Sequence, residues 1–285
     1  MTLGVFFLAP GAWLLTSSPA HAQSAEEILQ AVRRAEMKAE YSATQFVQSG
    51  DTREVARIYR DGLKRRLEWL QPSVKNGDVL VDDGENVSIY HRAENTLTQT
   101  QSPRRAPAFS SNGWKVGAPT RQDGRLVRVL RHSNGRELTI DEQTKVIVRN
   151  ESGRNVTALQ NLEFGAVPPA KFAFSPPSGV KITRLNGKLL TDLSLARRQA
   201  SWIKVPSQLP AGYKFESAVV GQSEVWLRYS NGQKRFSIFE QKTSEADLLP
   251  PKKVGGGWFW KQNGVRYLAT DVPDDAVKSL ASSLK

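Results

Sequence analysis

His91 and His132 are the side chains best suited to acid–base chemistry near neutral pH. Nucleophilic catalysis would need a serine or cysteine beside such a base, but the sequence has no cysteine and no G-x-S-x-G turn. His91 lies in a strand pattern at 89–92, and His132 lies at the end of a predicted hairpin. The sequence favours structural or surface roles for both and predicts no catalytic residue; the alternative is a hydrolase that depends on one of them.

Three neighbouring acidic residues, Asp82, Asp83 and Glu85, are a second candidate for chemistry. Such carboxylates can ligate Ca²⁺, but the loop pattern D-x-[DN]-x-[DN]-G-x5-E is not present. The run Asp-Asp-Gly at 82–84 is instead typical of a turn between two strands. The triple glycine at 255–257 lacks the Gly-Lys-Ser/Thr of a phosphate loop. The sequence therefore predicts no metal site and no cofactor.

Basic and aromatic side chains of the C-terminal third are candidates for binding a partner: Arg197, Arg198, Trp258, Trp260 and Arg266. Arginine pairs are common as solvated surface charge, and the two tryptophans are also compatible with a strand that has one aromatic in the core and one half exposed. Stacking of the tryptophans on bases is a further possibility for such a pattern.

The composition indicates a folded, basic chain. Its 285 residues carry 40 Lys and Arg against 28 Asp and Glu, a formal net charge of +12. With 39% hydrophobic residues the chain can bury a core, and it is long enough for two domains. Residues 23–180 hold 23 basic and 19 acidic side chains (net +4), and residues 181–285 hold 17 and 9 (net +8). We therefore expect an acidic partner to bind mainly the C-terminal part.

The N-terminal segment predicts export. Residues 1–22 carry no Lys, Arg, Asp or Glu, residues 3–15 are largely apolar, and Ala20-His21-Ala22 has the small-x-small form of a cleavage site. We expect 1–22 to be a cleaved signal peptide; a short buried helix is the alternative. The run is too short for a membrane span, which needs ~20 residues. Export also makes nucleic acid an unexpected partner.

Hydrophobic periodicity predicts one helix followed by many strands. Ser24 and Glu27 form a capping box ahead of apolar residues at helical spacing, so we expect a helix at about 24–39. Alternating patterns separated by turn residues then predict an antiparallel meander, with 102–124 as a long loop. A second unit begins near residue 202 and ends in a helix at 276–284.

The shortage of helices in the first unit bears on its interior. An antiparallel sheet must cover one apolar face, and a single helix covers little of it. Either the sheet curves around a hollow that suits an acyl chain, stabilised by about 0.8 kcal/mol per buried methylene, or it packs on itself without a cavity. The residue pattern leaves both open.

Motifs along the chain resemble two related families. One set of motifs resembles the LolA/RseB-type lipid-binding fold of bacterial envelope proteins. These motifs are RLEWLQP at 66–72, DVLVDDGENVSIY at 78–90, LTIDEQT at 138–144, VIVRNE at 146–151, LEFG at 162–165 and FAFSPP at 172–177. The C-terminal domain of MucB/RseB regulators is resembled by LPAGYKF at 209–215, VWLRYSNG at 225–232 and FSIFEQ at 236–241. The likeness covers almost all of the chain after residue 22.

The resemblance implies an α+β fold in two domains. A LolA-like antiparallel half-barrel with a helical lid would occupy 23–179, a basic linker 180–203, and a smaller α+β MucB/RseB-like domain 204–285. The half-barrel would enclose a hydrophobic cavity for a lipid, with these lining candidates: Phe46, Leu67, Trp69, Val81, Ile89, Leu97, Phe172 and Phe174.

The resemblance also implies a function. A MucB/RseB-type protein is a periplasmic, non-enzymatic regulator of sigma-factor signalling in envelope stress, which senses lipid and binds the periplasmic segment of an anti-sigma factor. The alternative is a periplasmic carrier of lipoproteins or lipids of the LolA type. Neither function requires a catalytic residue, a cofactor or a membrane-spanning segment.

Overall fold

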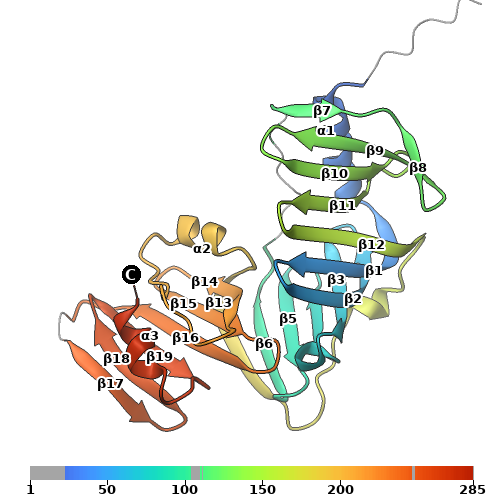
Figure 1. Ribbon diagram of the computed structural model, residues 1–285. Coiled ribbons are helices and arrows are strands. Elements are labelled where there is room, and N and C mark those ends of the chain that lie inside the picture. The colour runs from blue at the N-terminus through green and yellow to red at the C-terminus, as the bar shows by residue number, and fades with distance from the viewer. Residues whose placement is uncertain (1–22, 104–109, 111, 246–247, 285) are drawn as a thin grey trace, which may run out of the picture.

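A computed structural model describes residues 23–103, 110, 112–245 and 248–284, so the expected signal peptide lies outside the described residues. Strands dominate this part of the chain, with 52% of residues in strands and 12% in helices. The 19 described strands form one hydrogen-bonded sheet. Figure 1 shows that this sheet has two parts set at an angle to each other.

The first part of the sheet is antiparallel throughout. The short strands β7 and β8 both pair with β9, and the order continues β9-β10-β11-β12-β1-β2-β3-β4-β5-β6. The strands have these bounds: β1 (Glu40–Ser49), β2 (Thr52–Asp61), β3 (Lys64–Gln71), β4 (Val79–Asp82), β5 (Asn86–His91), β6 (Thr96–Gln101), β7 (Trp114–Val116), β8 (Thr120–Gln122), β9 (Arg125–His132), β10 (Arg136–Asp141), β11 (Ile147–Ser152) and β12 (Asn155–Phe164).

The second part continues from the first through one parallel pairing. The first half of β13 runs parallel to β6, and its last residues pair with β14, so this strand joins the two parts. From there the order is antiparallel, β13-β14-β15-β16-β19-β18-β17. The bounds are β13 (Lys181–Leu190), β14 (Lys214–Val220), β15 (Glu224–Ser230), β16 (Arg235–Lys242), β17 (Leu249–Val254), β18 (Gly257–Gln262) and β19 (Val265–Thr270).

Of the three described α-helices, one lies at the β7–β10 end of the first part and two lie along the second part (Figure 1). Helix α1 (Ala25–Glu36) begins with the expected capping box between Ser24 and Glu27. In α2 (Leu193–Gln199) the N-cap Asp192 accepts from two backbone N–H groups. Helix α3 (Val277–Ser282) follows the last strand. Two 3-10 turns, η1 (Ser73–Lys75) and η2 (Pro169–Phe172), complete the set.

The predicted α+β class with a helical lid is wrong, because the described chain is mostly β. The apolar side of helix α1 packs on one end of the sheet, where Ile28, Leu29 and Val32 contact the β9–β10 side chains Leu130 and Leu138. Instead of a lid, the apolar face of the first part meets other strands of the bent sheet. Its core joins residues of both parts: Tyr41, Ile58, Leu67, Leu80, Ile89, Leu189, Val219 and Trp226.

Two regions, one expected as a loop and the other as a partly helical linker, contain strands. Residues 102–124, expected as a loop, contain β7 and β8, which extend the edge along β9; residues 104–109 and 111 are outside the described residues. The range 180–203, expected as a basic linker, contains β13 and α2. β13 is therefore bound to the sheet on both sides.

Candidate functional site

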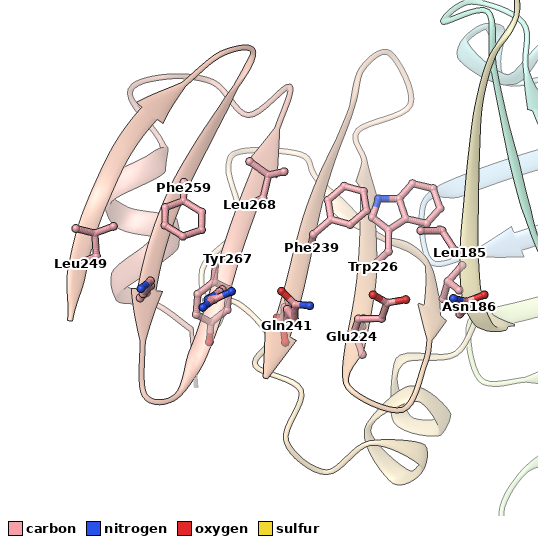
Figure 2. A pocket seen from close by; sticks show the side chains of 15 residues that line it. Leu185, Asn186, Glu224, Trp226, Phe239, Gln241, Leu249, Phe259, Tyr267 and Leu268 are labelled. Atoms are coloured by element: carbon pink, nitrogen blue, oxygen red, sulfur yellow. The ribbon is translucent and has the colours of Figure 1, made fainter. Parts of the chain in front are cut away.

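The C-terminal part of the sheet has one face covered by helices and an opposite face that the first part covers only at its β14–β15 end. Helices α3 and α2 cover the former face, where Ala196, Val277 and Leu280 pack with Tyr229 and other buried strand residues. Because side chains alternate along a strand, the residues between those buried ones point to the opposite face. Figure 2 shows this second face with its side chains drawn across successive strands.

A row of apolar side chains crosses this opposite face. The strand registers pair Val219 with Trp226, Trp226 with Phe239, Phe239 with Leu268, and Leu268 with Phe259, so these five residues lie side by side on β14, β15, β16, β19 and β18. The Trp226 and Phe239 rings stack with their centroids 6.0 Å apart. We call these five residues the apolar row. It forms the floor of a groove of about 650 Å³.

A polar row borders the groove on one side. The same registers align Glu224 with Gln241, Gln241 with Arg266, and Arg266 with Lys261. Both cations contact one carboxylate, that of Glu245. This border therefore carries the carboxylate of Glu224 at its β15 end. At its β19–β18 end it carries the cations of Arg266 and Lys261, which share the carboxylate of Glu245.

Two buried donors at the groove have no acceptor within the described residues. They are the indole Nε1–H of Trp226 and the Nε–H of Arg266. A buried donor without a partner costs about 1–3 kcal/mol. Both residues line the groove, with these two donor atoms themselves buried.

The apolar row is continuous with the core of the first part of the sheet. Val219 and Trp226 belong to the same buried cluster as Leu67 and Ile89, and Leu189 of β13 lies in that cluster too. Arg228, which follows Trp226 on the same face, places its guanidinium 5.3 Å from the Trp226 ring centroid. The groove therefore ends at the junction of the two parts.

Buried charges hold that junction together. From the second part, Arg228 contacts Glu94 (2.6 Å) and Arg235 contacts Asp78 (2.8 Å), both on the first part. From the first part, Lys75 contacts Glu216 of the second part at 2.7 Å. Lys75 also contacts Glu54 at 2.7 Å, and both arginines approach Glu216 within 3.4 Å. We call these residues, with His91, the junction cluster.

The charges of the junction cluster shift its pKa values together. Burial opposes ionisation of Glu216, but Lys75, Arg235 and Arg228 outweigh it and lower the pKa of Glu216 to about 2. The pKa of Asp78 is also lowered: burial opposes ionisation, and the hydrogen bond from His91 and the charge of Arg235 outweigh it. These acids therefore remain ionised at neutral pH.

Both histidines have hydrogen-bond partners within the described residues. His91 Nδ1 lies 3.0 Å from Asp78 Oδ2, and burial together with the two arginines lowers the pKa of His91. His132 Nε2 lies 3.0 Å from the Asn112 carbonyl oxygen, and its Nδ1 accepts from the Asn134 N–H.

The eight predicted cavity residues fall on two faces of the first part of the sheet. Cross-strand partners share a face, so Leu67 and Ile89, which both pair with Leu80, lie together, with Trp69 two residues along from Leu67. Val81 pairs with Arg66, and Leu97 with Tyr90, on the opposite face.

Phe172, Phe174 and Phe46 belong to this opposite face. The Phe174 ring lies 5.6 Å from that of Tyr90, and η2, which contains buried Phe172, is bonded to Arg66 through the Lys171 carbonyl. Phe46 pairs with Val55 and carries Arg53 over its ring. The structure thus brings Leu67, Trp69 and Ile89 together and separates them from the other five.

The five predicted partner-binding residues also divide. Arg266 lines the groove, whereas Trp260 is buried in the core beneath α3 and Trp258 donates to Asp274 on that side. Arg197 and Arg198 are exposed in the last turn of α2. The residues of the apolar row were missed as a site, although the alternation in VWLRY at 225–229 and FSIFE at 236–240 marks Trp226 and Phe239 as sharing one face.

Within the described residues, His, Asp and Glu form no group of three or more arranged to hold a metal ion. The same residues contain no helix with the length and apolar character of a membrane span.

No protein-family model and no curated protein matches this sequence. Solved structures do resemble it. An uncharacterized conserved protein from Thermus thermophilus is 19% identical, with 57% of this chain and 100% of that one covered and a TM-score of 0.45. MucB is 15% identical over 91% of this chain and 97% of its own, with a TM-score of 0.45. MucB in the Pseudomonas aeruginosa MucA/MucB complex is 16% identical over 92% and 98%, with a TM-score of 0.43. The resemblance to MucB predicted from the sequence motifs is confirmed, and it extends over most of the chain.

Proposed function

We propose that this chain is a MucB-like, non-enzymatic regulator of envelope stress signalling that binds a partner protein through the groove. The observation that carries the proposal is the apolar row, whose residues on β16, β19 and β18 lie on a face that no described helix covers. Apolar surface rimmed by polar side chains is typical of interaction sites. The class of partner, the periplasmic segment of an anti-sigma protein such as MucA, is taken from the complex of the similar protein MucB.

We also propose that the protein is exported and that an acyl chain regulates it. The motif at 1–22 supports export to the periplasm. The continuous apolar cluster supports lipid regulation, because an acyl chain on the face of Leu67 and Ile89 would meet Val219 and Trp226 at the end of the groove.

Binding of anti-sigma periplasmic segments to the purified chain tests the proposal, by calorimetry with and without a fatty acid. Leu268→Asp places a charge in the apolar row, and we expect it to weaken binding by more than roughly tenfold. Leu195→Asp on α2 is the matched control, since Leu268 and Leu195 are 37% and 42% exposed. No binding with or without lipid would exclude the regulator.

Mass spectrometry of protein purified from its own envelope tests the lipid part. We expect an acyl-chain ligand whose loss raises the affinity for the partner segment. Stoichiometric acyl-chain cargo without any partner binding would instead identify a carrier of the LolA type. Protein without lipid that also fails to take up a fluorescent fatty acid would contradict both lipid functions.

A further inference from the structure

His91 is buried at the junction of the two parts and is 5% exposed. Its Nδ1 lies 3.0 Å from Asp78 Oδ2, and because the Asp78 carboxyl is ionised, Nδ1 carries the proton and donates. Its Nε2 is also buried and has no hydrogen-bond partner among the described residues. Protonation of Nε2 would create a buried, charged N–H without an acceptor, which costs more than an unpaired neutral nitrogen.

The second part of the sheet supplies two cations near this ring. Arg235 Nη2 lies 2.8 Å from Asp78 Oδ2, the same oxygen that His91 approaches. Arg228 contacts Glu94, on the turn between β5 and β6, at 2.6 Å. Burial is the largest cause that lowers the pKa of His91, and the charges of both arginines lower it further, against the bond with Asp78. The closed junction therefore holds His91 in its neutral form.

The other carboxylates of the junction cluster are already bound to cations. The pairs are Glu54 with Lys75, Glu94 with Arg228 and Arg235, and Glu216 with Lys75, Arg228 and Arg235. Among the described residues, Asp78 is the carboxylate that His91 contacts. An imidazolium would have to share one oxygen of Asp78 with the Arg235 guanidinium. Water is the acceptor that remains for its second N–H.

We propose that His91 is an acid-sensitive latch between the two parts, and that its protonation separates them at the junction cluster. Separation admits water to Nε2 and leaves Asp78 to His91 alone. Ile89 lies two residues before His91 on the same face of β5 and belongs to the buried cluster that contains Val219 and Trp226. Opening of the latch therefore also uncovers the β14–β15 end of the apolar row.

Proton linkage gives the direction and the size of the effect. In an open junction the imidazole titrates near its ordinary pKa of 6.5, whereas the closed junction lowers this pKa. The closed junction is fully favoured above pH 6.5 and is lost progressively as the pH falls from there toward the lowered pKa. Within that interval the ratio of open to closed chains rises about tenfold for each pH unit.

Hydrogen exchange of the full chain, followed by mass spectrometry from about pH 7.5 to about pH 5 and corrected for the intrinsic pH dependence of exchange, tests the latch. The reporter is the peptide that covers β5 and residues 92–95, where the Arg92 N–H donates to Asp78 Oδ1 at 3.0 Å. The reference is the peptide of β10, whose Leu138 packs against α1 at the far end of the first part. We expect the protection of the reporter to fall about tenfold per pH unit below about 6.5, and that of the reference to stay constant.

Two matched variants assign the effect to one ring. His91→Asn keeps a side-chain N–H for Asp78 but stays neutral, so its reporter should lose no protection in acid. His132→Asn removes the histidine at the end of β9 and should behave as wild type. Circular dichroism establishes that each variant folds. An NMR titration of the wild-type imidazoles needs no variant, and we expect a pKa of His91 below 6.5.

Four results would overturn the latch. They are a pKa of His91 at or above 6.5, constant protection of the wild-type reporter, a loss in acid that persists in His91→Asn, and an equal loss in the β10 reference. The last result would mean that acid unfolds the whole chain rather than the junction.

Discussion

Glu240 provides the sharpest test of the physical interpretation of the C-terminal sheet. Its side chain is 1% exposed on the covered face, where Oε2 accepts from the Lys204 backbone N–H at 3.0 Å and Oε1 has no partner among the described residues. Burial raises the pKa of Glu240 to about 8, although the Lys204 N–H opposes the shift. We predict that Glu240→Gln stabilises the protein at alkaline pH.

The magnitude follows from proton linkage. Below the ordinary pKa of 4.5 the carboxyl is protonated in both folded and unfolded chains, so it contributes no pH dependence. Between pH 4.5 and about 8 only the folded chain keeps the proton, so stability falls as pH rises, by about 1.4 kcal/mol per unit. Over this interval the loss is about 5 kcal/mol. Gln, which stays neutral, lacks this dependence.

Urea unfolding followed by tryptophan fluorescence at several pH values from 4 to 9 provides the measurement. The difference in unfolding free energy between Glu240→Gln and wild type should rise with pH and level off above about 8. Glu163→Gln, an exposed glutamate on β12, is the matched control and should show little change. A difference that is independent of pH would refute the assignment of Glu240 as a buried, protonated acid.

Three further predictions concern the junction and the N-terminus. Glu216→Gln should destabilise the chain by about 3 kcal/mol at pH 7, because the pKa of Glu216 is about 2 in the folded chain and 4.5 ordinarily. The stability that the carboxylate contributes is lost only as pH falls through that interval. Urea unfolding at pH 7 and pH 3 measures the penalty, and an equal penalty at both pH values contradicts the prediction. Gly187→Ala places a Cβ 2.6 Å from the Val220 carbonyl oxygen, so β13 and β14 must separate. The midpoint of thermal unfolding should therefore fall by several degrees. An unchanged midpoint contradicts this close approach. Ser24→Ala removes one half of the capping box and should cost about 1 kcal/mol, measured by urea unfolding against Ser73→Ala, where no cap bond is lost.

Local sequence patterns predicted the elements whose stability depends on neighbours along the chain. The capping box located α1, and the turn at 82–84 joins β4 and β5 as expected, with the Asp83 carboxylate accepting from two backbone N–H groups. The framework motifs also predicted the resemblance to MucB. The prediction of a helical lid was wrong, because hydrophobic periodicity identifies an apolar face that must be buried but does not identify the element that buries it.

The sequence by itself determined most of the strands, the turns and the excess of charge in the C-terminal part, because each depends on residue type and short-range spacing; β7, β8 and β13 were missed. The tertiary structure decided which residues meet. The parallel pairing of β6 with β13 brings Asp78 and Glu94 to Arg235 and Arg228 across more than a hundred residues, and strand register alone aligns Trp226, Phe239 and Leu268 into one row. Register and strand order depend on pairing between distant segments, and a shift of one residue would turn the whole row to the other face. Hence Arg266 is the predicted partner-binding residue that lines the groove, whereas Trp260 lies in the core behind it.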